Sequence, residues 1–498
     1  MKIFETNKIT SSNPASETER LWIYNGLDVM VTLEVLQVIK PQLTNITQAT
    51  YEFSKSLQGP VLEMKLRGVK VNEAERRRAI EAYKKDIEFI EANLTRILHE
   101  GLGLILNWRS HVQLKHLFYT VLGLTPVRKR NSKGQIAPTV NRDALEKLEQ
   151  YFDAQPLIKH ILALRDIGKK VSTLETEVDP DGRMRTSYNI AGTTTGRLSS
   201  SFNDFGRGGN LQNIEERLRR IFEADPGMKF AYIDLEQAES RLVGAICYNK
   251  FSLTNYLDAC ESGDLHTTVC RMTNPQLNWS GDPKIDKEIA ERPFYRQHSF
   301  RHMAKVLGHG TNYLGQPHTM EKHTKVPQPI IKNFQLSYFV AFPEIPIWHE
   351  SVARTIKEEG KLISLTGRQR QFFGRRTDPT TIREAVAFDP QGSVADILNQ
   401  GMLNVWRANI VQLLLQIHDA VLIQYPEEQE DEIIPAVFKL ITIPVELNNG
   451  RTLIIPSEAK VGWNWSSASP SNPDGLIKFK GHDDRVRQPV TSILDLIH

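Results

Sequence analysis

The stretch FAYIDLEQAESRLVGA, residues 230–245, decides how the rest of the chain is interpreted. Its apolar run 230–233 is typical of a buried strand, and the charged segment after Asp234 is typical of a helix. An acidic residue where a strand leaves the core is well placed to hold Mg2+, which prefers carboxylate oxygens and leaves coordination positions for substrate phosphates. The alternative is that Asp234 only caps the following helix.

Length and composition are those of a globular protein with several domains. The 498 residues suggest about three domains, or one domain with large insertions. Because the net charge is only +3, any nucleic-acid role must rest on local basic patches. Three cysteines without a metal-binding spacing are interpreted as reduced thiols of an intracellular, cytoplasmic protein. No apolar stretch is expected to span a bilayer, and residues 1–19 lack the apolar core of a signal peptide.

The second informative stretch is RHMAKVLGHGTNYLG, residues 301–315. Side chains four apart lie along one slanting stripe of a helix, and here they are Arg301, Lys305, His309 and Tyr313. Two cations followed by an aromatic ring would suit a triphosphate at one end and a stacked base at the other. A solvated basic face is the alternative. Residues 264–326 are predicted to be mainly helical, with His266 near a helix start.

The third stretch is LLLQIHDAVLIQY, residues 413–425. Two apolar runs flank His418 and Asp419, which predicts a hairpin with an acidic residue at its tip. The alternative is that this pair only makes the turn. Residues 383–407 are predicted to be a loop followed by a helix, and residues 451–465 to give one more strand. The polar tail from Ser466 is expected to be partly disordered at its start.

The N-terminal third is predicted to be largely helical. Residues 17–43 form one helix in which Tyr24 and Asp28, four apart, share a face. Asn72 caps a long helix, with Glu75 three residues later. Apolar residues spaced three and four apart along it predict packing against a second helix, and these are Ile80, Tyr83, Ile87, Ile90, Leu94 and Ile97.

Three further segments are polar, and each has a nucleic-acid and a solvated interpretation. The basic cluster 128–130, with Lys133, is predicted in a loop that is either solvated or in contact with a phosphate backbone. Residues 182–201 suit a surface that hydrogen-bonds sugar and phosphate. Residues 365–376, LTGRQRQFFGRR, form a basic patch interleaved with aromatic residues.

Together these stretches resemble family A DNA polymerases, most closely the phage members, over about residues 17–465. DLEQAESRL (234–242) is similar to the first palm motif, RHMAKVLGHGTNYLG to the finger-helix motif, and QIHDAVL (416–422) to the second carboxylate motif. TTGRLSSS with NLQNI, and REAVAFDPQGSVAD, resemble two further signatures. Five signatures in family order form a specific pattern.

The resemblance implies an α+β right-hand fold, with an antiparallel palm sheet, helical fingers and a helical thumb. It implies the following division: 1–50 a remnant of an exonuclease domain, 51–71 the segment leading into the palm, 72–180 thumb, 181–260 palm with the first carboxylate motif, 261–380 fingers, 381–465 palm with the second carboxylate motif, and 466–498 a C-terminal tail.

The resemblance also implies an activity. Template-directed addition of deoxynucleotides to a primer 3′ end, in the replication of viral DNA, proceeds by in-line phosphoryl transfer. Asp234, Asp419 and the carbonyl of Leu235 would hold two Mg2+ ions about 3.5–4 Å apart, with Mn2+ as an alternative ion. The implied partners are primer–template DNA and deoxynucleoside triphosphates (dNTPs), and the implied catalytic form is a monomer in the host cytoplasm.

Further roles follow from the matched motifs. The triphosphate would be held by Arg301, Lys305 and His266, with Lys305 also a candidate proton donor to pyrophosphate. Around the nucleotide, the resemblance assigns Gln237, His309 beside the sugar, Tyr313 at the templating position, and Glu239 as a barrier to the ribose 2′-hydroxyl.

Contacts to DNA are assigned in the same way. Minor-groove acceptors occur on nearly every base pair, so contacting them checks pairing geometry without reading sequence. The assigned residues are Arg197 and Gln391 at these acceptors, Arg383 and His418 at the primer terminus, and Asn210, Gln212 and Arg241.

The sequence departs from the family pattern at several positions. His309 stands where Phe or Tyr is usual, which puts the handling of sugar analogues in question. Glu236 replaces a small polar residue, Ala420 replaces a Glu, and Ala387 occupies a site where Asn is common. Residues 201–209 lengthen a loop near the primer.

The N-terminus departs most. Tyr24-x3-Asp28 resembles the last motif of the family's 3′–5′ exonuclease, but 23 residues leave no room for the two earlier motifs. Because a two-metal nuclease site cannot be built from Asp28 alone, we expect no proofreading by this chain by itself. Either a separate exonuclease chain or other replisome subunit docks on residues 1–45, or the helix is a relic kept for packing.

Two competing functions remain open at this point. A single-subunit RNA polymerase shares the palm carboxylates and a similar finger helix, although Glu239 argues against it. A degenerate polymerase could instead bind or scaffold primer–template DNA, with salt-sensitive binding and no extension. Incorporation assays that compare ribo- and deoxynucleotides separate an RNA polymerase from a DNA polymerase, and a scaffolding protein would incorporate neither.

Overall fold

In this computed structural model, the described residues are 16–130, 134–203, 206–296 and 298–481. The chain divides into two compact units: a first unit of residues 1–57 with 242–393, and a second unit of residues 58–241 with 394–498. One boundary falls between residues 57 and 58, and the other two fall within helices α8 (Ala238–Phe251) and α16 (Pro379–Ala408). Lys133, part of the loop 201–209, and the end of the tail lie outside the described residues.

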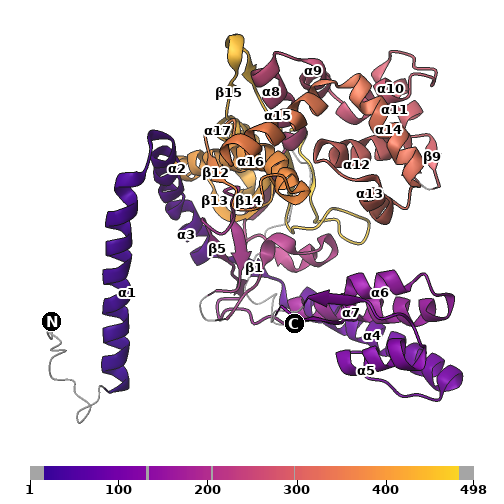
Figure 1. The fold of residues 1–498 in the computed structure, drawn as a ribbon. Helices are drawn as coiled ribbons and strands as arrows, with labels where there is room; N and C mark the ends of the chain where they lie inside the picture. Colours follow the sequence, from indigo (N-terminus) through magenta and orange to yellow (C-terminus); the bar gives the residue numbers. More distant parts are fainter. Residues whose placement is uncertain (1–15, 131–133, 204–205, 297, 482–498) are drawn as a thin grey trace. The chain divides into compact units, whose positions relative to one another are not determined.

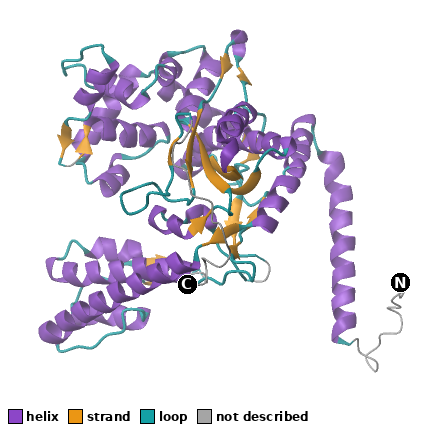
Figure 2. Cartoon of the chain, turned by 180° about the vertical axis from the view of Figure 1, so that it is seen from behind, coloured by secondary structure: helices purple, strands orange, loops and turns teal. Residues whose placement is uncertain are grey.

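A five-stranded antiparallel sheet forms the core of the second unit, as predicted for a palm. Its strand order is β13-β14-β8-β17-β18, so β8 is central and pairs with β14 on one side and β17 on the other. The strands are drawn in orange in Figure 2. The apolar residues of the central strand are buried. Phe230, Ala231 and Ile233 are fully inaccessible to solvent. The strands are β8 Met228–Leu235, β13 Gln412–Ile417, β14 Ala420–Pro426, β17 Ser457–Gly462 and β18 Ile477–Lys478.

Smaller elements of the second unit surround this sheet. A three-stranded antiparallel sheet has the order β4-β1-β7, and β5 pairs with β6 in a separate ribbon. The elements are α3 Gln58–Arg67, β1 Val69–Val71, β4 Arg183–Met184, β5 Ser187–Asn189, β6 Ser199–Ser201, η5 Leu211–Asn213, η6 Glu216–Ile221, β7 Phe222–Glu223, η7 Glu427–Gln429, α17 Glu430–Ile441, β15 Val445–Glu446, η8 Asn448–Gly450 and β16 Thr452–Leu453.

The expected disorder at the start of the tail is wrong. Residues 466–481 are ordered, because bridges join Ser467 to Leu476 and Ser469 to Asn472, and β18 adds the last strand of the palm sheet. The side chains of Asn464 and Asn472 hydrogen-bond each other in both directions and fasten this loop to the sheet.

The thumb region, residues 72–180, is built on a pair of long helices, as the heptad pattern predicts. The Asn72 side chain accepts a hydrogen bond from the Glu75 amide at the start of α4, and Gly103, with φ 64°, ends it. Helix α4 packs along α7, and its Ile87, Leu94 and Leu98 are buried between them. The elements are α4 Glu73–Leu102, α5 His111–Lys115, η3 His116–Val121, β2 Arg128–Arg130, β3 Ile136–Pro138, α6 Arg142–Leu148, η4 Phe152–Ala154 and α7 Gln155–Leu174.

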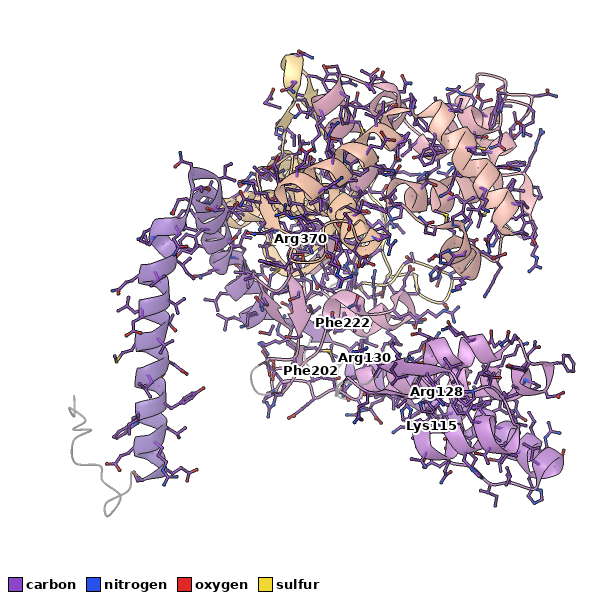
Figure 3. The ribbon with its side chains drawn as sticks, viewed as in Figure 1. Lys115, Arg128, Arg130, Phe202, Phe222 and Arg370 are labelled. Atoms are coloured by element: carbon purple, nitrogen blue, oxygen red, sulfur yellow. The ribbon has the colours of Figure 1, made fainter. Side chains whose placement is uncertain are left out.

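The basic cluster 128–130 is not in a loop, which corrects the expectation. It forms strand β2, which pairs with β3 in an exposed hairpin of the thumb region. All three side chains are exposed, and Figure 3 shows Arg128 and Arg130 on this part of the chain. Both faces of this two-stranded ribbon are open to solvent. Its sequence therefore lacks the alternation of apolar and polar residues that would predict a strand.

The first unit is mainly helical, as predicted for residues 264–326. Its core gathers large aromatic side chains, among them Tyr256, Tyr338, Phe342 and Trp348. Its elements are α1 Glu17–Ile39, η2 Lys40–Gln42, α2 Asn45–Ser56, α9 Asn255–Glu261, α10 Leu265–Thr273, α11 Pro283–Ala290, β9 Pro293–Tyr295, β10 His298–Ser299, α12 Phe300–Asn312, α13 Pro317–Thr324, α14 Gln328–Ala341, α15 Glu344–Glu359, β11 Lys361–Ile363 and β12 Gln369–Gln371 (Figure 1).

Two expectations about helices are corrected. Residues 383–407 are helical throughout, because α16 begins at Pro379 and continues past Pro390, with Val386 and Phe388 in the core. The second is the expectation that no apolar stretch could span a bilayer. The segment Glu17–Gln42 is long and apolar enough to cross a membrane by length and composition. Length and composition alone do not place it in a membrane, but none of the residues of α1 is buried in this structure.

Candidate active site

The two predicted carboxylates lie at the same end of the palm sheet. Asp234 is in register with Ala420, at the start of β14, and the Leu235 amide donates a hydrogen bond to the Asp419 carbonyl at 3.2 Å. His418 and Asp419 form the two-residue turn of the β13–β14 hairpin, and His418 has the positive φ of 51° that such tight turns require. The turn therefore places Asp419 beside the end of the strand that carries Asp234.

The electrostatics of this strand end favour a cation. Burial raises the pKa of Asp234 to about 6, and the negative charges of Asp419 and Glu458 act in the same direction. Glu458 lies directly opposite Asp234 in β17, a neighbour that the sequence analysis missed. A divalent cation would offset the mutual repulsion of these carboxylates.

Arg197 is the cation that contacts these carboxylates in the structure. Its Nη2 donates to Glu239 Oε1 at 2.6 Å and to Asp419 Oδ1 at 3.2 Å. Arg197, Glu239 and Asp419 therefore come together from the β5–β6 ribbon, the start of α8 and the hairpin turn, as the sequence analysis expects of one site.

The carboxylate pair fits a hard divalent cation. Two buried polar atoms, Arg197 Nε and Gln237 Oε1, have no hydrogen-bond partner among the described residues, and Gln237 lies in the turn after β8 with φ 54°. No group of three or more His, Cys, Asp or Glu side chains in the described ranges is arranged to hold a metal. Ions bound by Asp234 and Asp419 would therefore complete their coordination with water and substrate oxygens, as Mg2+ does.

Of the three predicted triphosphate residues, Arg301 and Lys305 lie on α12 of the first unit and His266 lies on α10. The Ser299 side chain accepts a hydrogen bond from the His302 amide and so caps α12, which begins one residue before Arg301. Arg301 donates to both carboxylate oxygens of Asp264, from Nε at 2.9 Å and from Nη2 at 3.1 Å. A bidentate contact of this kind fixes the plane of the guanidinium group.

Asp264 is a second residue that the sequence analysis missed. It caps α10 through the amides of His266 and Thr267 while it holds Arg301. Although burial alone would raise its pKa, hydrogen bonds from Arg301 and Thr267 lower the pKa of Asp264 to about 2. The GDLH sequence at 263–266 fits an N-cap, but nothing local to it indicates the arginine 37 residues further on.

Positive charge gathers around His266. Burial, followed by the charges of Arg301 and Lys305, lowers the pKa of His266 to about 4, so its imidazole is neutral at pH 7. Lys305 is exposed one turn after Arg301. At the end of the same helix, the His309 and Tyr313 rings meet edge to face, with centroids 5.0 Å apart. These residues of the first unit can accept an anion at one end of α12 and a planar group at the other.

Three residues assigned to DNA make hydrogen bonds within the second unit, where Gln212 and Arg241 are buried and Asn210 is exposed. Gln212 is buried, and its amide nitrogen donates to the carbonyls of Leu198 and Gln416 and to the Gln416 side chain. Asn210 accepts from the Gln212 amide, and the buried Arg241 donates to the Glu236 carbonyl at 3.1 Å. These bonds position the neighbouring loops, and contact of these residues with DNA stays a prediction.

The remaining predicted residues divide between the units. His418 is exposed at the tip of its hairpin in the second unit. Arg383 donates to the Thr380 hydroxyl at 3.1 Å on α16, and Gln391 is partly buried one residue after Pro390, both in the first unit. Each unit thus carries its own share of the predicted site.

Comparisons with known proteins agree with this architecture. The family model described as DNA polymerase family A matches residues 75–467. Curated relatives include DNA polymerase I of Chloroflexus aurantiacus (26% identical over 90% of this chain and 46% of the relative) and of Deinococcus radiodurans (27%, 87% and 44%). The thermostable DNA polymerase I of Thermus aquaticus is 25% identical over 84% of this chain and 48% of the relative. The chain spans about half the length of these relatives.

A solved structure shares the fold. It is the POL domain of Pol1 from M. smegmatis in complex with DNA primer–template and dNTP, with a TM-score of 0.63 and 23% identity over 82% of this chain and 69% of that one. The likeness confirms the α+β right-hand polymerase fold expected from the sequence, with an antiparallel palm sheet and helical fingers and thumb.

Proposed function

This chain belongs to DNA polymerase family A, and we propose that it is a template-directed DNA polymerase that adds deoxynucleotides to a primer 3′ end. The observation that carries the proposal is the position of Asp234 and Asp419 at adjacent strand ends of the palm sheet. The relatives' names give the class of reaction, and the substrates proposed are primer–template DNA and dNTPs.

Two Mg2+ ions would be held by Asp234 and Asp419, with the Leu235 carbonyl as a further ligand and Mn2+ as an alternative ion. When bound, the ions activate the primer hydroxyl and stabilise the charge on the leaving pyrophosphate. Arg197 pairs with both Asp419 and Glu239. We propose that it releases them as metal and nucleotide bind, and that it then contacts a minor-groove acceptor at the primer end.

The first unit would hold the triphosphate. Arg301 is oriented by Asp264, and Lys305 is exposed one turn further along the same helix, where its ammonium group is accessible. A neutral His266 adds an N–H donor at pH 7 without adding charge. Lys305 is the proposed proton donor to pyrophosphate, because a protonated amine beside the leaving group can neutralise the charge that develops there.

Selection of the nucleotide would rest on the second unit together with His309 and Tyr313. Glu239 is only slightly exposed, and a carboxylate there would crowd and repel a ribose 2′-hydroxyl. Gln237 would face the nucleotide, and Tyr313 would stack at the templating position. Gln391, Arg383 and His418 are proposed to contact the primer–template, as are Asn210, Gln212 and Arg241 once DNA is bound.

The N-terminal helix has a proposed role of its own. Asp28 is exposed on α1, and one exposed carboxylate cannot hold two metal ions, so we propose that residues 1–498 alone do not excise a mismatched primer end. The apolar surface of α1 is proposed to dock a separate exonuclease chain or another replisome subunit. The proposed role in viral DNA replication inside the host cytoplasm is supported by the resemblance of the motifs alone. The relatives reported above are bacterial and do not bear on it.

Primer extension on a recessed 3′ end with Mg2+ tests the proposal. Wild type is compared with Asp419→Ala and with Glu428→Ala, an exposed carboxylate of the same unit that serves as a matched control. Wild type and the control should extend with deoxynucleotides, and Asp419→Ala should not. Removal of a mismatched primer end by the pure chain would refute the proposal about proofreading.

Two other results would point to different functions. Extension with ribonucleotides at rates comparable to those with deoxynucleotides would favour an RNA polymerase. Salt-sensitive binding of primer–template DNA without extension would favour a scaffolding module.

A further inference from the structure

The thumb region contains a cleft of about 620 Å3 between α4, α6, α7 and the segment after α4. Its apolar wall is formed by Ile87, Trp108 and Val171. The volume lies within the range of sites that hold small ligands. It belongs wholly to the second unit and shares no residue with the carboxylate group of the palm.

Cations outnumber anions around this cleft. Arg109, Arg142, Arg165 and Lys169 line it, and Glu175 is the single carboxylate among the residues that form its walls. Arg142 pairs with Asp166 and Glu146, and Arg109 lies 3.9 Å from Glu91, so the positive charge available to a ligand is that of Arg165 and Lys169. Glu175 is already paired with Lys84 at 2.7 Å. His111 adds an imidazole to the same lining. The ligand that this lining favours therefore carries negative charge.

Arg165 is the central cation. It is partly buried, and its Nη1 donates to the Val140 carbonyl at 2.8 Å, but no acidic side chain among the described residues pairs with it. Burial and the like charge of Arg142 lower the pKa of Arg165. A partly buried cation without a counterion is unfavourable, and an anion in the cleft would supply the missing charge.

The apolar wall is rigid. The Trp108 indole donates to Glu91, Arg109 lies over its ring at 4.6 Å, and the ring edge packs over Gly168. A side chain at position 168 would begin to fill the space beside that ring, since its Cβ would lie 3.7 Å from Trp108. A fixed apolar wall facing a cationic rim suits a ligand with a flat apolar part and an anionic part.

We propose that this cleft binds a nucleotide, with its base against Ile87, Trp108 and Val171 and its phosphate at Arg165 and Lys169. The nucleotide is either free or part of a single strand, since both present the same base and phosphate. The site is independent of the proposed polymerase activity, because none of its residues takes part in that reaction.

Equilibrium binding of fluorescein-labelled dT8 to the full chain, without divalent metal, tests this proposal. Lys169→Met removes an exposed cation of the cleft, and Lys159→Met makes the same change on the same helix outside it. We expect Lys169→Met to bind dT8 about fivefold more weakly than wild type does. The variant should also release about one counterion fewer on binding, which makes the dependence of its affinity on salt concentration less steep. Lys159→Met should bind as wild type does.

Arg165→Met and Lys169→Glu complete the test, with thermal unfolding to confirm that each variant folds. Both should weaken binding at least as much as Lys169→Met. Displacement of dT8 by dAMP from wild type, but not from these variants, would assign the cleft to a free nucleotide. Loss of dT8 binding without competition by dAMP would assign it to a single strand. The proposal is overturned if Lys169→Met and Lys169→Glu both bind dT8 as tightly as Lys159→Met.

Asp419→Ala separates this site from the polymerase site. It should bind dT8 as wild type does even though it cannot extend a primer. Loss of extension in Asp419→Ala therefore bears only on the proposed function, and loss of binding in Lys169→Met bears only on the cleft.

Discussion

At the scale of single residues, Asp264 of the first unit does two things: it caps α10 and orients Arg301. Asn can replace Asp as a helix cap, so Asp264→Asn removes the charge of the pair while keeping the cap. We expect the variant to lose about 1–2 kcal/mol of unfolding free energy at pH 7, a value reduced for the partial exposure of the pair.

The pH dependence of this loss follows from the pKa of Asp264. Its folded value of about 2 lies below the ordinary value of 3.8, so the stabilisation is fully present above about pH 4 and is lost as the pH falls toward 2. Urea unfolding of wild type and Asp264→Asn at pH 6 and pH 3 measures this. A difference between the two proteins that grows on acidification would contradict the assignment.

Glu239 carries a second prediction at this scale. Its carboxylate accepts a hydrogen bond from Arg197 at 2.6 Å, and the same guanidinium contacts Asp419, so Glu239 lies close to the proposed metal site. Glu239→Ala should raise ribonucleotide use relative to deoxynucleotide use by at least about tenfold, which corresponds to about 1.4 kcal/mol. The ratio of kcat/KM for the two substrates measures the change, and an unaltered ratio would show that Glu239 does not select the sugar.

At the scale of elements, a buried ion pair joins the palm sheet to α17. Lys229 of β8 contacts Glu430 at 2.7 Å, both are almost wholly buried, and the Tyr425 hydroxyl donates to the same carboxylate. Lys229→Met would leave that carboxylate buried without its cation and should cost about 3–5 kcal/mol of unfolding free energy. Denaturant unfolding measures the loss.

The double variant Lys229→Met/Glu430→Leu is the control for this pair. Because it removes both charges, it should recover much of the lost stability. A double variant that is no more stable than Lys229→Met would show that packing around the pair, and not the buried charge, determines the effect.

Elements that depend on local pattern could be predicted from the sequence. The strand that ends at Asp234, the hairpin at His418 and Asp419, and the pairing of α4 with α7 all follow from periodicity, caps and turn residues. The helix through Pro390 could not, since proline usually ends a helix. Here, packing of Val386 and Phe388 into the core outweighs that preference.

Contacts between distant residues could not be predicted either. Glu458 approaches Asp234 only because β17 pairs with β8 in a particular register, and no local pattern encodes that register. Asp264 and Arg301 meet because α10 packs on α12. Residue types and spacing therefore predicted the strand, hairpin and helix that carry the proposed carboxylates and cations, whereas the supporting partners of these side chains required the structure.

At the scale of the whole molecule, the two units divide the proposed chemistry. The second unit carries Asp234, Asp419 and Glu239, proposed for metal binding and for selection of the sugar, and the first carries the cations proposed for the triphosphate. Neither unit carries all of the residues proposed for the reaction. Substitution of a proposed catalytic residue in either unit should therefore abolish primer extension without unfolding the other unit.

The central claim is that Asp234 and Asp419 act together as one metal-binding pair. The rate of single-nucleotide incorporation under single-turnover conditions tests it, for Asp234→Asn, Asp419→Asn and the double variant. Residues that act as a unit are not additive, so we expect each single variant to lose at least about 10³-fold and the double variant to lose no more. Incorporation at the wild-type rate by either single variant would contradict the claim.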